Sequence, residues 1–244
     1  MFTHFLIKEV KMGLSIKNVM VSAYILMIFS ANVYAQAGFS EVNNEIFDKA
    51  HLRNIQQAGT LHYKYQIEHF VDGDREDTID LVLSNLRNTG RKDTHIDFLT
   101  GEYNRPYHDR ENQQGNTVAV FFLEFDVREM GRIFNKGNNN NRWHYMQKKL
   151  KWALAKGASK KEVDIEYKGQ TLKGVQYTVQ PFINDPKKSE FPLHANKYYT
   201  FTLSSEIPGE IYQVRTIVPD GATWSEGDAV LIDESVTFSS FEAS

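Results

Sequence analysis

The chain has 244 residues, 41% of them hydrophobic and 13% aromatic, and its formal net charge is −3 at pH 7. It contains no cysteine, which excludes disulfide bonds, thiol nucleophiles and thiolate metal sites. A chain of this size buries roughly 70% of the surface that its unfolded form exposes, so a hydrophobic core alone can stabilise it. The slight acidic excess argues against a general nucleic-acid-binding protein, which would carry a basic surplus.

The first 37 residues have the pattern of a secretory signal peptide. Three lysines precede an uncharged, mostly apolar run over residues 19–29. Small residues follow at the spacing of a cleavage site, which predicts cleavage after Ala35 or Ala37. The apolar run is shorter than the ~20 residues of a membrane-spanning helix. An uncleaved anchor or a buried helix is the alternative.

Residues 38–244 are therefore expected to form a single mature domain, soluble in the periplasm or outside the cell. This holds whether translation starts at Met1 or at Met12. Since no cysteine follows the signal segment, a bacterial lipoprotein anchor is excluded. Residues 1–35 hold three lysines and one glutamate, so their loss leaves 25 basic and 30 acidic residues in a more acidic mature chain.

The mature chain opens with a predicted helix over residues 40–57. Ser40 can cap its first turn, and Gly59 stands where a helix often ends. The hydrophobic period then changes from about 3.6 to 2, which indicates half-buried strands. Turn signals such as Asp72-Gly73 separate these strands, which are expected to form an antiparallel meander over residues 60–69, 78–86 and 94–99.

The middle of the chain predicts a helix pair inserted between strands. Residues 100–115 are polar and indicate a long loop, after which Asn116 can cap a helix over residues 118–134 with a broad apolar face. A second helix is predicted over residues 143–156, with Gly157 as its stop. Strands then return over residues 163–167, 172–179, 198–203, 211–218 and 230–241.

This order of elements predicts an α+β fold. We expect a curved antiparallel sheet of about eight strands, packed against an N-terminal helix and the inserted helix pair, because runs of sequential hairpins make antiparallel sheets. The strands are rich in aromatic residues, which suit either core packing or the wall of an apolar cavity. The candidate ligand-binding residues under the second reading are Phe121, Phe125, Met130, Met146, Tyr63 and Tyr65.

Familiar catalytic and cofactor motifs do not occur. The chain has no G-x-S-x-G, H-E-x-x-H, Walker or G-x-G-x-x-G sequence, so it predicts no catalytic residue, no metal site and no cofactor. The polar loop 103–111, from Tyr103 to Glu111, contains His108 and Asp109 and is the remaining basis for an enzyme hypothesis. A polar surface loop is the alternative.

The segment 143–161, from Trp143 to Lys161, is basic and contains aromatic side chains. Such a helix is able to lie on an anionic membrane surface, and the alternative is an ordinary solvated helix face. The predicted partners are therefore an apolar ligand or an envelope protein, together with a peripheral membrane contact through this segment. No nucleic acid is expected.

The element order over residues 40–241 resembles the LolA/LolB-like periplasmic fold. That resemblance implies helices covering the concave face of a curved sheet, with an apolar ligand cavity between them. Residues 97–102 (DFLTGE) and 122–130 (FLEFDVREM) also resemble exported proteobacterial proteins with no assigned activity. The expected function is a periplasmic carrier or binding protein for a lipid or another apolar ligand. The alternatives are an envelope scaffold and an enzyme that uses the loop 103–111.

Overall fold

The computed structural model describes residues 40–134 and 142–244 of the chain. The predicted signal segment, residues 1–37, lies outside the described residues. The N-terminal part is a short helix α2 (Glu41–Asn43), continued by a π-helical turn η1 (Asn44–Asp48) and followed by a 3₁₀ helix η2 (His51–Asn54). Ser40 caps α2, since its hydroxyl accepts a hydrogen bond from the amide of Asn43 at 3.3 Å.

The prediction of a single helix over residues 40–57 is wrong. Lys49 has an extended backbone, and the chain then turns inward so that His51 and Leu52 are buried. The amide of Leu52 donates to the carbonyl of Gln114 at 3.0 Å, which replaces the next helical hydrogen bond. Gly59 caps no helix but starts the first strand, where a Cβ would lie 2.2 Å from a backbone oxygen of the last strand.

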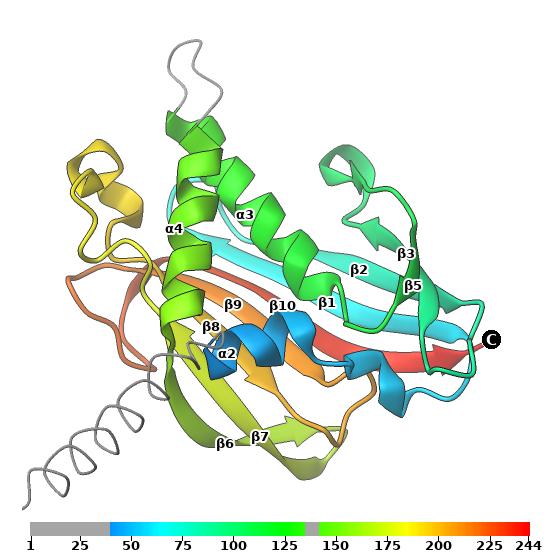
Figure 1. Ribbon diagram of the computed structural model, residues 1–244. Coiled ribbons are helices and arrows are strands. Elements are labelled where there is room, and N and C mark those ends of the chain that lie inside the picture. Colours follow the sequence, from blue (N-terminus) through cyan, green and yellow to red (C-terminus); the bar gives the residue numbers. More distant parts are fainter. Residues whose placement is uncertain (1–39, 135–141) are drawn as a thin grey trace, which may run out of the picture. The chain divides into compact units, whose positions relative to one another are not determined.

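One antiparallel sheet organises the described chain (Figure 1). Its neighbouring strands follow the order β4-β3-β2-β1-β10-β9-β8-β7-β6, and β5 pairs with β3. The ten strands are β1 (Gly59–His69), β2 (Arg75–Ser84), β3 (Lys92–Phe98), β4 (Arg105–Pro106), β5 (Arg110–Gln113), β6 (Ser159–Tyr167), β7 (Gln170–Val179), β8 (Tyr198–Leu203), β9 (Ile211–Pro219) and β10 (Val230–Ala243).

The predicted fold class is confirmed: the protein is α+β, with a curved antiparallel sheet and helices packed against it. The sheet has ten strands where about eight were expected, because the polar segment 100–115 is not one long loop. It forms a 3₁₀ helix η3 (Gly101–Tyr103) and the short strands β4 and β5, which pair back onto β3. Two further 3₁₀ helices, η4 (Lys188–Glu190) and η5 (Pro192–His194), lie before β8.

The sheet consists of two meanders joined in the middle. β1, β2 and β3 form the first, and β6 to β10 form the second. The first and last strands, β1 and β10, pair with each other and connect the two. Their register places Tyr65 opposite Val236 and Ile67 opposite Glu234. Side chains from both ends of the chain therefore meet at the centre of the sheet.

The inserted helix pair is confirmed as α3 (Val118–Phe134) and α4 (Arg142–Lys156). Figure 1 shows both helices on one face of the sheet. The side-chain oxygen of Asn116 accepts from the amide of Val118 at 3.2 Å, as expected of a cap. A Cβ on Gly131 would lie 2.8 Å from the Cβ of Trp143, so the glycine permits the close approach of the helices.

The core fills the space between the sheet and the helices. It includes the alternate residues of β1 that the sequence predicts to face inward, together with aromatic residues of α3 and apolar residues of α4, all buried: Leu61, Tyr63, Tyr65, Phe121, Phe122, Phe125, Met146, Leu150 and Leu154. None of the helices in the described part of the chain combines the length and the apolar character that crossing a membrane requires.

Candidate functional site

A cavity of about 750 Å³, here called the α3 cavity, opens between α3, the β1–β2 hairpin, η3 and β10. Part of its wall is apolar and comes from Ile67, Phe125, Met130 and Ile232. The rest is polar and carries six carboxylates against three Lys or Arg side chains: Asp72, Asp74, Glu102, Asp126, Glu129, Glu234, Arg75, Arg105 and Lys197. The cavity is thus amphipathic and has an excess of acidic groups.

The first buried charges at this cavity form an ion pair. Asp126 of α3 and Lys197, which directly precedes β8, are each 2% exposed. The ammonium of Lys197 donates to one carboxylate oxygen of Asp126, and the hydroxyl of Tyr199 donates to the other at 2.6 Å. Burial, together with the negative charge of Asp126, raises the pKa of Tyr199 well above its ordinary value. Tyr199 therefore stays protonated and acts as a hydrogen-bond donor.

The second buried carboxylate is that of Glu234 on β10, which is 6% exposed. The hydroxyl of Tyr65 donates to it at 2.7 Å and itself accepts from the guanidinium of Arg75 at 3.2 Å. Within residues 40–134 and 142–244, no Lys or Arg nitrogen lies within 4.0 Å of the Glu234 carboxylate. Burial, with a smaller contribution from the charge of Asp126, raises the pKa of Glu234 to about 7.

The rim of the cavity is stiffened by contacts between cations and aromatic rings. The guanidinium of Arg75 lies 3.6 Å from the ring centre of Tyr103, and that of Arg105 lies 5.8 Å from the ring centre of Phe125. Arginine packs well on aromatic faces, and Arg105 also lies 3.7 Å from the carboxylate of Glu129. The rim cations are therefore fixed at the entrance, while the buried acids lie deeper.

His194 adds a buried neutral group to the wall, since it is 2% exposed. Burial, followed by the positive charge of Lys197, lowers the pKa of His194 to about 3. The imidazole is therefore uncharged at neutral pH. His194 therefore adds no charge to the inner cavity, where Asp126, Lys197 and Glu234 are the buried ionisable groups described above.

The six sequence-predicted ligand-binding residues are all buried, but they lie in two places. Tyr65, Phe125 and Met130 line the α3 cavity. The other three lie in the core: Tyr63, Phe121 and Met146. As an example of these core contacts, the hydroxyl of Tyr63 accepts a hydrogen bond from the Asn116 side chain at 2.7 Å. The structure thus brings three of the six to one site, at one end of α3.

The loop 103–111 is likewise divided. Tyr103 and Arg105 line the α3 cavity. His108, Asp109 and Glu111 are exposed and do not line it. The carboxylate of Asp109 lies 2.6 Å from a ring nitrogen of His95 on the outer side of β3. The start of this loop therefore contributes to the cavity, and its histidine and acids do not.

Sequence reasoning missed the buried charges, although a sequence signal for them exists. Asp126 lies four residues after Phe122 and four before Met130, in the middle of the apolar stripe of α3. Glu234 alternates with apolar residues of β10 at an inward-facing position, and Lys197 stands two residues before the buried Tyr199. A charge at a position that the hydrophobic period assigns to the interior is costly, so it indicates a paired or functional group.

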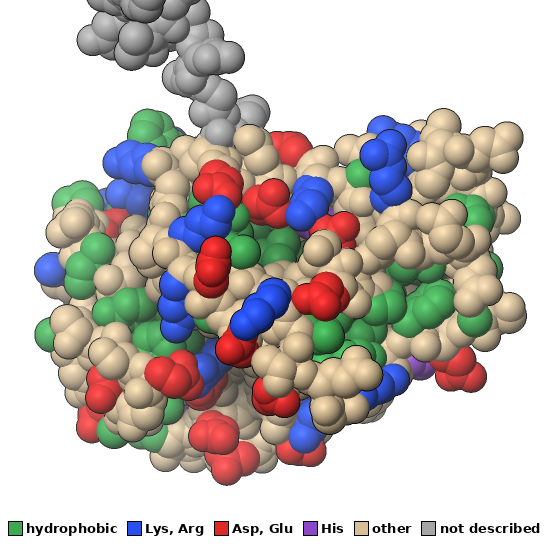
Figure 2. Space-filling model, turned by 90° about the horizontal axis from the view of Figure 1, so that it is seen from below, with side chains coloured by type: hydrophobic (Ala, Val, Ile, Leu, Met, Phe, Trp, Pro, Cys, Tyr) green, Lys and Arg blue, Asp and Glu red, His purple; other side chains and the backbone are tan. Residues whose placement is uncertain are grey.

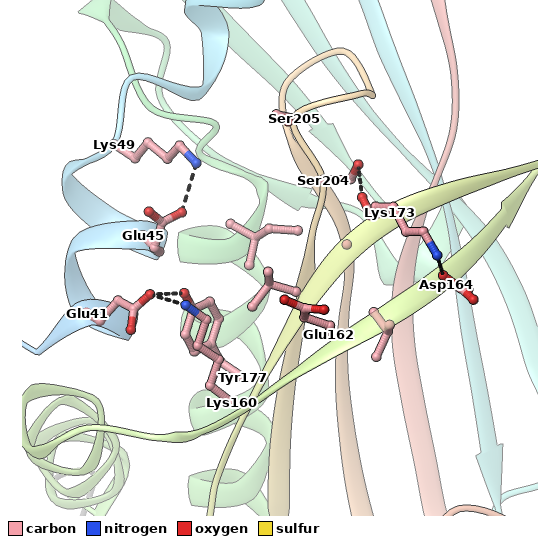
Figure 3. A pocket seen from close by; sticks show the side chains of 14 residues that line it. Glu41, Glu45, Lys49, Lys160, Glu162, Asp164, Lys173, Tyr177, Ser204 and Ser205 are labelled. Carbon is pink, nitrogen blue, oxygen red and sulfur yellow. Dashed lines mark hydrogen bonds and ion pairs between the residues drawn. The ribbon is translucent and has the colours of Figure 1, made fainter.

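A second cavity of about 780 Å³, here called the β6–β7 cavity, lies between the N-terminal helical segment and strands β6 and β7 (Figure 3). Figure 3 shows Glu41 pointing toward Lys160 and Tyr177, and its carboxylate lies 2.6 Å from the Lys160 ammonium. The Lys49 ammonium contacts Glu45 at 2.8 Å. Figure 2 shows charged side chains of both signs gathered around hydrophobic ones on this face.

The segment 143–161 does not form one helix. Gly157, with a φ of 124°, ends α4, and Lys160 and Lys161 lie on β6. The Lys160 ammonium pairs with Glu41 instead of extending the helix surface. Among the residues that the structure describes, no group of three or more His, Asp and Glu side chains is arranged to hold a metal ion.

No model of a known protein family matches the chain, and no curated protein matches it. Among solved structures, the chain is similar to the crystal structure of the Mycobacterium tuberculosis lipoprotein LppX, with 7% sequence identity and a TM-score of 0.31. The superposition covers 75% of this chain and 86% of LppX. A likeness at this TM-score carries no argument, so the resemblance to LolA/LolB-like proteins stays a prediction.

Proposed function

We propose that this protein binds a small ligand in the α3 cavity, and that this ligand combines an apolar portion with a positively charged group. The observation that carries the proposal is the buried carboxylate of Glu234 on the cavity wall. Among the described residues it has the Tyr65 hydroxyl as a close partner and no Lys or Arg within ion-pair distance. Buried charges in proteins are normally paired.

The charge balance of the inner cavity supports a cationic group on the ligand. Asp126 and Glu234 supply two carboxylates, and Lys197 supplies one ammonium that is already bound to Asp126. The positive charges of Lys197 and Arg75 act on Glu234 from a distance, but when Glu234 is ionised no cation contacts it within the described residues, in a poorly solvated space where charges interact strongly. A ligand ammonium beside Glu234 would balance its negative charge, and the excess of carboxylates in the cavity lining would attract such a ligand.

The apolar part of the wall supports a hydrocarbon portion on the same ligand. Phe125, Met130 and Ile232 are buried and line the same cavity as Glu234 with apolar side chains. A cavity of about 750 Å³ lies in the range of small-ligand sites, which are usually apolar with a few placed polar groups. Such a site recognises the head of a ligand by charge and its remainder by burial.

The predicted signal peptide suggests where binding would take place. We propose that the protein acts as an exported binding or carrier protein, in the periplasm or outside the cell. Export itself stays a prediction from residues 1–37. The envelope scaffold without a small ligand remains the alternative, and it would leave the α3 cavity unused.

Three ligands with the same ten-carbon chain and different heads test the proposal: decylamine, 1-decanol and decanoate, measured by isothermal titration calorimetry at pH 8. We expect decylamine to bind best, about tenfold or more above the alcohol, because it forms a charge-assisted hydrogen bond with Glu234. Glu234→Gln should remove that difference and leave the alcohol bound. The matched control, Glu162→Gln in the β6–β7 cavity, should change nothing.

The pH dependence gives a second readout. As pH rises through the pKa of Glu234, the carboxylate loses its proton while decylamine stays charged. Its affinity should therefore increase between about pH 6 and 8, and the affinity of 1-decanol should not. If none of the three compounds binds, or if decanoate binds as well as decylamine, the proposal is wrong.

A further inference from the structure

The outer face of α4 differs from the rest of the molecule in charge. The helix spans Arg142–Lys156 and contains no Asp or Glu, although the whole chain has more acidic than basic residues. Its inner face is buried against the core. Its outer face carries the exposed residues that are here called the α4 basic surface: Lys148, Lys151, Trp152 and Lys156.

The charge of this surface is not neutralised by neighbouring carboxylates. Basic residues at the edges of the surface do have partners, since the Lys149 ammonium contacts Asp185 at 2.8 Å and Arg142 lies 4.0 Å from Glu190. Within the described parts of the chain, Lys148 and Lys151 lie within 4.0 Å of no carboxylate. A second element adds to this positive face, because Lys187 lies 5.4 Å from the ring centre of Tyr145 on α4.

Trp152 gives the surface an apolar anchor. It is 58% exposed, and the Lys156 ammonium lies 5.4 Å from its ring centre. Tryptophan has a large apolar ring and a polar N–H group, which suits it to the boundary between apolar and aqueous surroundings. Tryptophan flanked by lysines on a helix face matches the boundary of a bilayer, where indole rings lie at the level of the headgroups and lysines meet phosphates.

We infer that the α4 basic surface docks onto an anionic phospholipid surface. Charge complementarity favours this partner: a protein with an acidic net charge would be oriented with the α4 basic surface toward the lipid. Trp152 would enter the headgroup region while Met146, Leu150 and Leu154 remain in the core. The helix would lie on the membrane, since its apolar face is already occupied by the protein's own sheet and α3.

Co-sedimentation with vesicles tests the inference on the full chain. The vesicles contain phosphatidylcholine alone or phosphatidylcholine with 30% phosphatidylglycerol. We compare the wild type with Lys148→Gln/Lys151→Gln and with Trp152→Ala. The matched control, Lys168→Gln/Lys173→Gln, removes the same charge from the β6–β7 hairpin. Because the N-terminal apolar run is the same in every variant, differences between variants report on the folded domain.

We expect binding to the anionic vesicles that weakens as salt is added. Each lysine near an anionic surface strengthens binding about fivefold, so the α4 double variant should bind about 25-fold more weakly. Trp152→Ala should also weaken binding, and Trp152 fluorescence should shift to shorter wavelength on binding in the wild type. The control double variant should bind like the wild type.

Three results with vesicles would each overturn the inference. These are equal binding to neutral and anionic vesicles in all variants, an equal loss in the control double variant, and retention of binding by both α4 variants. Binding to a DNA duplex or to heparin without binding to vesicles would assign the surface to another polyanion and would also overturn it. Circular dichroism spectra of the α4 variants should match the wild type, since all substituted side chains are exposed.

Discussion

The two cavities carry similar sets of charged side chains in different surroundings. In the β6–β7 cavity, lysines and carboxylates pair across the entrance, and their side chains are largely in contact with solvent, as in the Lys173–Asp164 pair with 81% and 61% exposure. In the α3 cavity, Asp126, Lys197 and Glu234 are almost fully buried. Water screens the first set, so its pairs contribute little to stability, whereas burial of the second set makes its charges costly unless they are paired.

Breaking the buried pair should have the largest effect of all the changes considered. Lys197→Met leaves the buried Asp126 without its ammonium, so we expect a loss of about 3–5 kcal/mol in the free energy of unfolding. The measurement is urea unfolding at pH 7. Lys160→Met in the β6–β7 cavity is the matched control and should leave the midpoint unchanged, because its partner Glu41 is solvated. Equal effects of the two substitutions would contradict the comparison.

Replacing Glu234 should have the opposite effect and increase the free energy of unfolding. Its pKa in the folded protein is raised to about 7 from 4.5, so the unfolded chain releases this proton first as pH rises. The free energy of unfolding therefore decreases as pH rises from about 4.5 to 7, because the folded protein then has to hold an ionised carboxylate in a buried position. Glu234→Gln should stabilise the protein by about 1–3 kcal/mol at pH 8 and by little at pH 4.5. Thermal unfolding at both pH values measures this.

Glu162→Gln provides the control for this substitution. Glu162 lines the β6–β7 cavity and is exposed, so its replacement should not change the pH dependence of stability. If Glu234→Gln stabilised the protein equally at pH 4.5 and at pH 8, ionisation of the Glu234 carboxylate would not be the cause of the stabilisation.

The smallest expected effect concerns the hydroxyl groups that bind a carboxylate in each cavity. Tyr65→Phe removes the donor to Glu234, so the pKa of Glu234 should rise further and stability at pH 8 should fall by about 1 kcal/mol. Tyr177→Phe removes the corresponding bond to the solvated Glu41, at 2.9 Å, and should have less effect. Urea unfolding curves of both variants at pH 8 measure the two losses of stability. A larger loss for Tyr177→Phe than for Tyr65→Phe would contradict the contrast between the buried and the solvated carboxylate.

The sequence predicts much of the fold because the strands and the helix pair follow strong local patterns. The period of two over β1 and the apolar face of α3 are sufficient to place Tyr65 and Phe125 inside. The prediction of a single N-terminal helix fails because tertiary contacts of His51 and Leu52 end the helix. Helix propensity does not include such contacts. The pairing of β4 and β5 with β3 is not predicted for the same reason, since it also depends on tertiary contacts.

The candidate site is less predictable, because it depends on positions far apart in the chain. Asp126, Lys197 and Glu234 come from α3, from the residue before β8 and from β10, and only the sheet order brings them together. Each of them is visible as a charge at an inward position. Their mutual distances, and thus the buried ion pair and the raised pKa, follow from the strand order and from the packing of α3 on the sheet, and cannot be read from any local segment.

The pairing of β1 with β10 also sets the time at which the site is built. The Tyr65–Glu234 hydrogen bond joins residues 169 positions apart, and β10 is the last strand of the chain. During synthesis the first meander must wait, with an open edge on β1, until β10 has emerged, and such long-range pairing folds slowly. A chain that stops before Val230 would leave β1 and β9 each with an additional unpaired edge and would have no Glu234. A stop before β10 would therefore produce an aggregation-prone product, and synthesis of β10 is the condition for both a continuous sheet and a finished cavity.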